Sequence, residues 1–370
     1  MKVKVLQVVS DIIPDSGVQK VLMEYFRHFY QEVTYDFIYW GEQDPAMIKE
    51  IEELGGNVYK IVSPLKISEF RREWNEFCQN HNGEYDIFEN SLVFLGFFFK
   101  DVKKTLGVRV SITHSHTNRF GDSKLSNLRN KLFYHLTGSV TGDVLFSCTK
   151  KAGHASFGKK IQRKPWYVIN NAFELAKFKY NLRVRNEVRQ EMGWTDKYVI
   201  TNVGRFSPPK NHKLIMTTFA ELNKTNPNAQ LVLIGSGPLR EKIVTQAREL
   251  KVDDKVSFLG VRNDVQRLLQ GTDTFFFPSI FEGLGIALVE AQVAGAQCLA
   301  SDVIPEEANI TNYQHLSLKA SPADWAQKLR ELVDSSRITD GYVRAVKAGF
   351  DINTEAEKLQ HLYAKLISRG

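Results

Sequence analysis

Short apolar runs alternate along the chain with longer stretches in which apolar residues recur every three or four positions. VKVLQVVS (3–10) is a run of the first kind, and VQKVLMEYFRHFY (18–30) follows it with helical spacing. Repeated alternation of strand and helix is typical of a parallel α/β sheet. We predict the strands of a first series at 3–10, 34–40, 57–62, 86–90, 108–114 and 143–148.

A second series of apolar strands begins after the stretch WYVINNAF. Its predicted strands lie at 198–204, 229–235, 256–260, 273–279 and 296–301, with helices between them. The connection from Lys164 to Tyr180 contains Pro165 and few periodic apolar positions, which marks a boundary.

A chain of 370 residues exceeds a single ordinary core and favours two domains. We therefore predict two Rossmann-like domains, 1–165 and 166–350, that face each other across a cleft. An amphipathic helix at 351–370 would pack back on the first domain. Ligands of open parallel sheets bind at the carboxyl ends of the strands, so the chemistry is expected in the loops there.

Charge is distributed unevenly along the chain. The net charge is +7, from 49 Lys and Arg against 42 Asp and Glu. Residues 100–170 hold 14 of the basic residues and three of the acidic ones, which leaves 35 basic and 39 acidic residues elsewhere. Such a basic region suggests a phosphorylated ligand, an anionic lipid or nucleic acid as partner, or else a merely solvated surface.

A basic amphipathic helix is predicted within this region, with apolar positions from Leu125 to Leu136. Lys124, Arg129 and Lys131 lie off its apolar stripe, so the helix could rest on an anionic membrane or face the core. The apolar stretch 91–100 is too short to span a bilayer and predicts a buried helix or strand. The three cysteines are widely spaced, which fits a reducing cytosol and argues against a CxxC zinc site.

Two loops of the first series carry candidate chemistry. Gly17 precedes a helix whose first N–H groups could meet an anion, or it is an ordinary turn. In VSITHSHTNRF, His114, His116 and Arg119 crowd a strand end. A third metal ligand at a suitable spacing is missing, so we predict a sugar-binding or acid–base role, with a plain polar loop as the alternative.

Two loops of the second series carry glycines and cations. In NVGRFSPPKNHKL, Arg205 and Lys210 follow a strand that ends at Gly204, and two fixed cations there suit a diphosphate. In LVLIGSGPLREKI, Gly235 and Gly237 would let a ligand approach the backbone closely. Arg240 stands where a dinucleotide fingerprint would have its third glycine, which disfavours an NAD site.

The stretch FEGLGIALVE places two carboxylates around a Gly-x-Gly turn at a helix start. Gly283 and Gly285 would expose N–H groups at the positive helix end, a suitable phosphate seat. A carboxylate can accept two ribose hydroxyls, which suits Glu290, while Glu282 could meet a sugar. Helix capping and surface charge are the alternative interpretation.

Together these motifs resemble the family-four retaining glycosyltransferases of the GT-B fold, and in particular bacterial capsule and exopolysaccharide transferases. The E-x7-E pattern stands as Glu282 to Glu290 and the GR-x4-K loop as Gly204, Arg205 and Lys210, while IGSGPL, GVRNDV and INNAFELAKF are also similar. The resemblance covers nearly the whole chain. It implies catalytic roles for Glu282, His116, His114, Arg205 and Lys210, and donor-binding roles for Gly17, Gly204, Arg205, Lys210, Gly235, Arg262, Phe281, Gly283, Leu284, Gly285 and Glu290.

The chain departs from the family pattern at its first loop. Ser16 precedes Gly17 where the family usually has two glycines, which affects how closely that loop wraps a phosphate. The sequence contains no Asp-x-Asp motif, which usually holds a divalent metal on a nucleotide diphosphate, so no metal and no other cofactor is expected.

The resemblance implies transfer of a sugar from a nucleotide-sugar donor, a UDP-sugar in our interpretation, to a saccharide or lipid-linked acceptor with retention of configuration. A nucleotide-sugar epimerase of the same fold, or a non-catalytic transferase partner subunit, are the alternatives. The expected location is cytoplasmic, with peripheral contact between the basic 100–170 region and the inner membrane face. No nucleic-acid-binding motif is present, so nucleic acid is not an expected partner.

Overall fold

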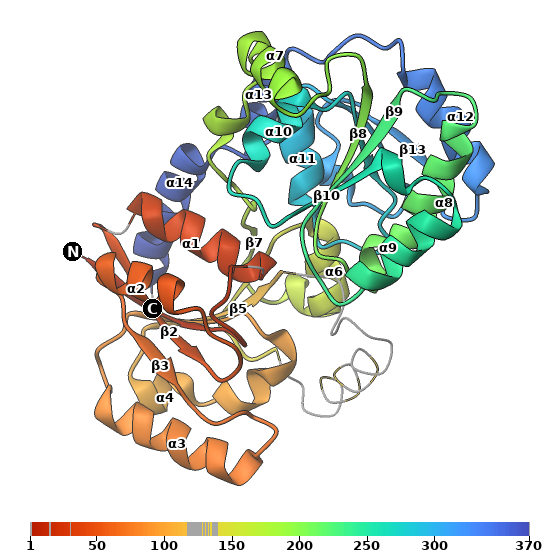
Figure 1. Cartoon of the computed structure of the whole chain (residues 1–370). Helices are drawn as coiled ribbons and strands as arrows, with labels where there is room; N and C mark the ends of the chain where they lie inside the picture. Colours follow the sequence, from red (N-terminus) through yellow and green to blue (C-terminus); the bar gives the residue numbers. More distant parts are fainter. Residues whose placement is uncertain are drawn as a thin grey trace. The chain divides into compact units, whose positions relative to one another are not determined.

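The computed structural model describes residues 2–14, 16–29, 31–116, 128, 130, 132, 134 and 140–369. The chain forms two compact units, shown in Figure 1: Met1–Phe173 together with Asp351–Gly370, and Glu174–Phe350. Arg119, Lys124, Leu125, Arg129, Lys131 and Leu136 lie outside the described residues, and with them most of the predicted basic helix.

The first unit is built on a seven-stranded parallel sheet with the order β3-β2-β1-β4-β5-β6-β7. The predicted strands of the first series are confirmed, and β7 is an additional short strand that sequence periodicity missed. The bounds are β1 (Val3–Val8), β2 (Val33–Tyr39), β3 (Val58–Lys60), β4 (Ile87–Asn90), β5 (Val110–Ser115), β6 (Val144–Ser147) and β7 (Trp166–Val168).

Side chains alternate between the two faces of this sheet, and each face has its own apolar cover. Leu6, Val8 and Phe88 join a core formed with α3 and α4. On the opposite face Tyr35 packs 5.4 Å from the Phe26 ring of α1. The helical elements are α1 (Gly17–Phe29), α2 (Pro45–Glu53), α3 (Ile67–Asn80), η1 (Val93–Phe99), α4 (Val102–Leu106), α6 (Lys150–Phe157), η2 (Gly158–Gln162) and α14 (Ile352–Ile367).

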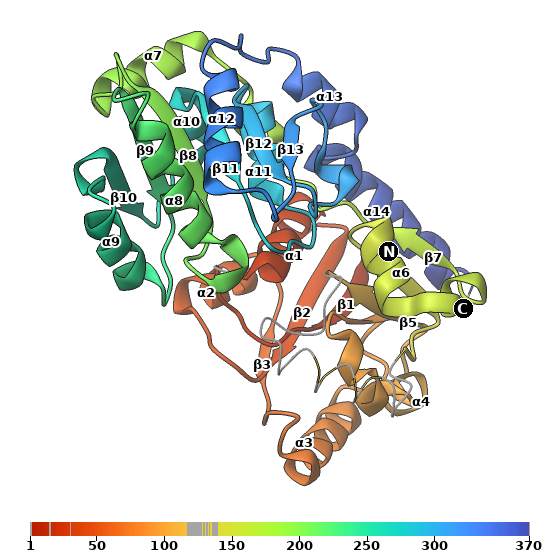
Figure 2. The same ribbon diagram turned by 90° about the vertical axis from the view of Figure 1, so that its right-hand side faces the viewer.

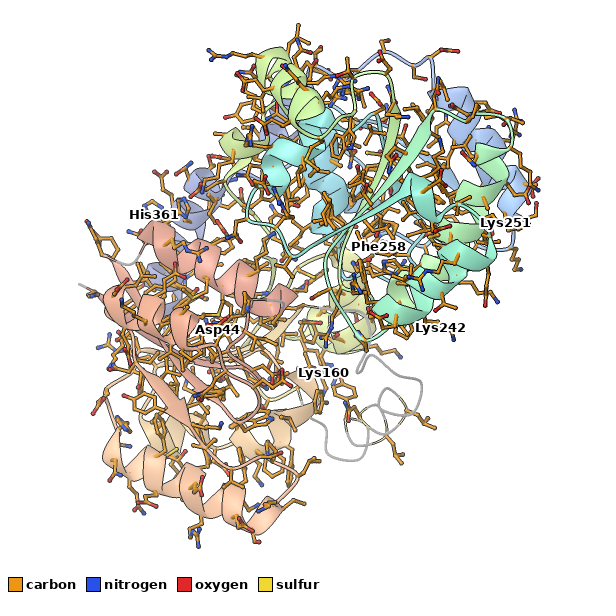
Figure 3. All side chains as sticks on the ribbon, in the orientation of Figure 1. Asp44, Lys160, Lys242, Lys251, Phe258 and His361 are labelled. Carbon is orange, nitrogen blue, oxygen red and sulfur yellow. The ribbon has the colours of Figure 1, made fainter. Side chains whose placement is uncertain are left out.

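Two local features of the first unit follow from its sequence. Asp44, labelled in Figure 3, begins α2 because its carboxylate accepts the Ala46 N–H at 2.7 Å ahead of Pro45. The predicted apolar element at 91–100 is the 3₁₀ helix η1. The last helix, α14, packs against α1 in this unit, as predicted.

The second unit holds a six-stranded parallel sheet with the order β10-β9-β8-β11-β12-β13. The bounds of its strands are β8 (Tyr198–Val203), β9 (Ala229–Ile234), β10 (Val256–Gly260), β11 (Thr274–Phe277), β12 (Gln297–Ser301) and β13 (Gln314–Leu316). Its helical elements are η3 (Leu175–Phe178), α7 (Leu182–Glu191), η4 (Pro208–Lys210), α8 (His212–Asn223), α9 (Arg240–Glu249), η5 (Asp253–Lys255), α10 (Val265–Gly271), α11 (Ile286–Val293), η6 (Glu306–Ala308), α12 (Pro322–Leu332) and α13 (Gly341–Lys347).

Helices cover both faces of the second sheet. Ile200 belongs to a large core with α8, α9 and α12, and its neighbour Val199 belongs to a smaller one with α7 and α10. Figures 1 and 2 show α8 and α12 together on one side of the strands and α7 and α10 on the other. Burial of both faces explains why these strands read as continuous apolar runs.

The strand order reverses at the same point in both sheets, between β1 and β4 in the first unit and between β8 and β11 in the second. Loops that leave adjacent strands at such a point diverge to opposite faces, which opens a crevice at the carboxyl ends of the strands. In the part of the chain that the structure describes, no helix is long and apolar enough to cross a membrane.

Candidate active site

The loops that follow β8 and β11 are tied together at the switch point of the second sheet. Ile280 donates its backbone N–H to the Pro209 carbonyl at 2.7 Å, and the Asn211 side chain donates to the Pro278 carbonyl at 3.1 Å. Asn211 has a φ of +57° and begins α8. The GRFSPPK and FEGLG motifs, about 70 residues apart in sequence, therefore form one structural element.

Lys210 and Glu282 form an ion pair inside this element. The Lys210 Nζ lies 2.7 Å from the Glu282 Oε1, and the two side chains are only 20% and 12% exposed. The ammonium also lies 5.0 Å from the centre of the Phe277 ring. A Cβ added at Gly204 would lie 3.1 Å from the Lys210 Cε, so glycine leaves room for the lysine stem. Three predicted site residues thus lie together.

The other predicted cation, Arg205, is exposed at the start of the same loop. Two helices, α8 and α11, begin next to these loops, and the first N–H groups of a helix carry partial positive charge. Lys210, Arg205 and two helix starts form a cationic surface suited to an anion of two or more charges.

His212 is a site neighbour that sequence reasoning missed. Burial, with the charge of Lys210 as a smaller cause, lowers the pKa of His212 to about 4. Its ring packs edge-on against Phe206 at 4.8 Å. The ring is therefore neutral near neutral pH, and the positive charge of this loop comes from Arg205 and Lys210.

The glycines of the third loop allow backbone to approach backbone. Gly235 and Gly237 follow β9 with φ of +136° and +152°, and an added Cβ at Gly235 would lie 2.1 Å from the Gly204 carbonyl oxygen. The Phe206 N–H donates to the Ser236 carbonyl at 2.7 Å. These contacts explain both glycines, because the loop after β9 packs closely against residues 204–210. We call residues 204–210, which carry Arg205 and Lys210, the cation loop.

Substituting Gly235 with alanine is expected to destabilise the protein by about 1–3 kcal/mol and to raise the KM for the donor, because the new Cβ displaces the Gly204 carbonyl. Thermal denaturation and donor kinetics measure the two effects. Gly193→Ala is the matched control, since Gly193 also has a positive φ but a Cβ there meets nothing within 4 Å. Equal behaviour of the two variants would contradict the prediction.

The two carboxylates of FEGLGIALVE lie on either side of the start of α11. Gly285, with a φ of +93°, is the N-cap residue, and no side chain caps the helix. Glu290 lies in the helix and is 3% exposed. Phe281 and Gly283 are half-buried and Leu284 is buried. Capping and plain surface charge therefore do not explain the two glutamates.

Arg262 lies apart from the ion pair, on the loop that follows β10. It is exposed, and its guanidinium binds the Asp264 carboxylate through two hydrogen bonds of 2.8 and 2.7 Å. Since β9 separates β10 from β8 in the sheet, Arg262 is two strands away from the cation loop.

The predicted residues of the first unit lie at the carboxyl ends of β1 and β5. Gly17 begins α1, and an added Cβ there would meet nothing within 4 Å. His114 is buried in β5, and its Nδ1 lies 2.6 Å from the Glu89 Oε1. His116 follows the strand, and its Nε2 lies 3.3 Å from the Ser91 Oγ. Burial, and secondarily His114, holds the pKa of His116 well below its usual value.

Two Rossmann-like parallel sheets, one in each unit, are typical of the GT-B fold. Residues 184–349 match the model of the family described as "Glycosyl transferases group 1". The second unit of the chain is therefore similar to the group 1 glycosyltransferases.

Several known glycosyltransferases are similar to this chain in sequence or in fold. The chain is 28% identical to the putative glycosyltransferase EpsF of Bacillus subtilis, over 97% of this chain and 96% of EpsF. It is 25% identical to an Escherichia coli UDP-Gal:α-D-GlcNAc-diphosphoundecaprenol α-1,3-galactosyltransferase, over 54% of each chain. The fold is similar to that of Anabaena HepE in complex with UDP and glucose, with a TM-score of 0.77, 16% identity, and coverage of 98% and 100% of the two chains.

Proposed function

We propose that the protein transfers a sugar from a UDP-sugar to a lipid-linked or saccharide acceptor during synthesis of a bacterial surface polysaccharide, with retention of configuration and without a metal ion. The observation that carries this proposal is the Lys210–Glu282 pair between two helix starts at the β8/β11 switch point. The names of the Escherichia coli relative and of the HepE complex support a UDP donor, and the relative's name supports a diphosphate-lipid acceptor.

The roles of the second unit's residues follow from their charge. Lys210 and Arg205 stabilise the leaving diphosphate, and the N–H groups from Gly283 to Gly285 assist them. Lys210 occupies one carboxylate oxygen of Glu282, so the other oxygen remains to accept hydroxyls of the transferred sugar. Glu290 accepts the ribose hydroxyls, and Arg262 contributes near the base. Fixed cations supply the charge that a metal ion supplies elsewhere.

In the first unit, Gly17 serves the donor phosphate, and His116 exchanges hydrogen bonds with the transferred sugar. His116 is better suited than His114 to contact substrate, because His114 is bound to Glu89 within the core. The acceptor attacks from the face that the diphosphate leaves, so configuration is retained and no protein nucleophile is required.

Peripheral contact with an anionic membrane is part of the proposal. Leu128 and Leu132, four residues apart on the predicted basic helix, are 65% and 59% exposed. Apolar side chains at one helical face that do not enter the core favour a surface-lying helix.

Turnover with a panel of UDP- and GDP-sugars, in EDTA and with or without a polyprenyl-diphosphate-linked acceptor, tests the proposal. We expect nucleotide release from a UDP-sugar that depends on the acceptor, survives chelation, and yields a product with the donor's anomeric configuration. Release of an epimerised sugar without acceptor would identify an epimerase instead. Absence of turnover with every donor would contradict an enzymatic role.

A further inference from the structure

A buried carboxylate lies behind the two histidines of the first unit. Glu89, on β4, is 1% exposed, and both of its oxygens are occupied. Its Oε1 lies 2.6 Å from the His114 Nδ1, and its Oε2 accepts the hydroxyl of Tyr363 at 2.7 Å. This arrangement fixes the ring orientation of His114 and places hydrogen on its Nδ1 if the carboxylate is ionised.

Tyr363 comes from the last helix, 274 positions after Glu89. Its hydroxyl also lies 3.0 Å from the hydroxyl of Tyr35 on β2. Both tyrosines are fully buried, and burial, together with the charge of Glu89, raises their pKa values well above the usual range. Their hydroxyls therefore remain protonated, and Tyr363 donates to Glu89 at every physiological pH.

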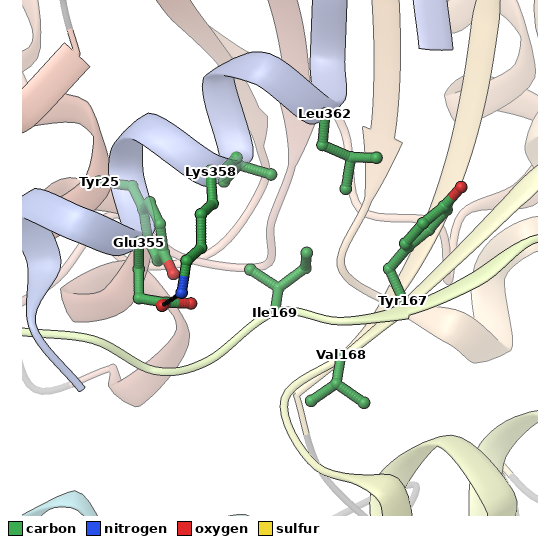
Figure 4. A pocket seen from close by; sticks show the side chains of 8 residues that line it. Tyr25, Tyr167, Val168, Ile169, Glu355, Lys358 and Leu362 are labelled. Carbon is green, nitrogen blue, oxygen red and sulfur yellow. Dashed lines mark hydrogen bonds and ion pairs between the residues drawn. The ribbon is translucent and has the colours of Figure 1, made fainter. Parts of the chain in front are cut away.

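The position of Tyr363 depends on how α14 is anchored. At the start of the helix the Asn170 amide donates to Glu355 at 3.1 Å, and the Tyr25 hydroxyl donates to the Asn170 carbonyl at 2.7 Å. Glu355 also pairs with Lys358 at 2.6 Å. Figure 4 shows this pair beside Tyr25 at the edge of a pocket of ≈ 150 Å³. These contacts hold α14 against the rest of the first unit.

The rings of His114 and His116 lie against each other. The two imidazole rings lie 3.8 Å apart between centroids with planes tilted by 31°. In the described part of the chain, the His114 Nε2 and the His116 Nδ1 are buried without a hydrogen-bond partner. Charge on one ring therefore acts on the other at close range and with little screening by water.

His114 is the neighbour that can balance the charge of Glu89. A buried carboxylate requires a compensating positive group, and within the described residues the ion pair of Glu89 is with His114. The titratable groups around the cluster are His114 and His116 from β5 and its end, Tyr363 from α14, Tyr35 from β2, and Tyr25 from α1 beyond it. None of the tyrosines can supply positive charge.

We propose that Glu89, held by Tyr363, is a positioning residue for His116: it keeps His114 protonated, and His114 in turn keeps His116 neutral and correctly oriented. A neutral His116 can both donate and accept hydrogen bonds to sugar hydroxyls, whereas an imidazolium can only donate. The role of His116 toward substrate rests on the proposed function, but the charge states of the two rings do not.

Histidine ¹⁵N NMR of the whole protein tests the charge states directly. Resonances are assigned with His114→Gln and His116→Asn. We expect an imidazolium for His114 and a neutral ring for His116 at pH 7. In Glu89→Gln, His114 should become neutral and the titration of His116 should move to higher pH by about one unit. A neutral His114 in the unmodified protein, or an unchanged His116 in Glu89→Gln, would overturn the proposal.

Two further variants keep the test decisive. Tyr363→Phe removes one donor to Glu89 and preserves the core volume, so it should shift His116 in the same direction by less, even if Glu89→Gln folds poorly. Glu84→Gln removes a surface Glu–His pair with His81 and should shift neither ring. The pH dependence of kcat is then compared between the unmodified protein and Glu89→Gln. If the rings respond as expected but the acidic limb of this profile does not shift together with the titration of His116, Glu89 does not act on turnover through His116. Donor turnover by the unmodified protein would still support the proposed function.

Discussion

Substituting Lys210 with methionine is expected to lower kcat by about 10²–10³, the size of effect seen when one preorganised charge-stabilising group is removed. Methionine keeps an apolar stem beside Gly204, while the ammonium is lost together with its contacts to Glu282 and the Phe277 ring. Steady-state kinetics with the UDP-sugar identified in the donor panel measure the effect. The matched control is Lys213→Met, which removes an exposed cation one turn away.

Glu282→Gln, and the double variant that combines it with Lys210→Met, show whether the ion pair serves catalysis or only the stability of the loops. An ion pair that only stabilises the loops predicts lower melting temperatures for both single variants and recovery in the double variant. A pair that handles the donor predicts near-normal melting temperatures and activity that stays low in the double variant. Near-normal activity in either single variant would show that the pair does not belong to the active site.

The architecture could be predicted because two-sided burial gives parallel strands a strong signal. The loop after β8 and the loop after β11 were both identified from strand ends followed by glycine. The three-residue strands β7 and β13 were missed, whereas β3, of the same length, was predicted from the longer stretch 57–62. The 3₁₀ form of η1 was not predictable, because VFLGFFF is apolar on every side.

Less of the candidate site than of the fold could be predicted from the sequence. Sequence spacing could not choose between His114 and His116, because the distinction depends on Glu89 and Tyr363, which are distant in sequence. The same holds for Gly235, whose φ and contact with Gly204 appear only once two loops pack. Residue type predicted what each group can do chemically, and long-range packing decided which groups it acts on.

Substituting Asp273 with asparagine is expected to destabilise the second unit by about 3 kcal/mol, the cost of breaking a buried ion pair by removing one partner. Asp273 precedes β11 and is 19% exposed. Its carboxylate pairs with Arg185 and Arg189 of α7 and accepts the Val199 N–H at 2.8 Å. Two arginines and the start of β8 therefore depend on one carboxylate.

This effect should be confined to stability, because Asp273 lies at the amino end of β11 and the cation loop follows the carboxyl end of β8. The melting transition is expected to fall by about 6–12 °C, with donor KM unchanged at 20 °C. Buried Trp194 and Trp325 report on this unit by fluorescence. Asp254→Asn, at an exposed position of the same unit, should leave the transition in place. A normal melting temperature for Asp273→Asn would mean that the backbone carbonyls of residues 270–272, which Arg185 also binds, suffice to hold the arginine without its carboxylate.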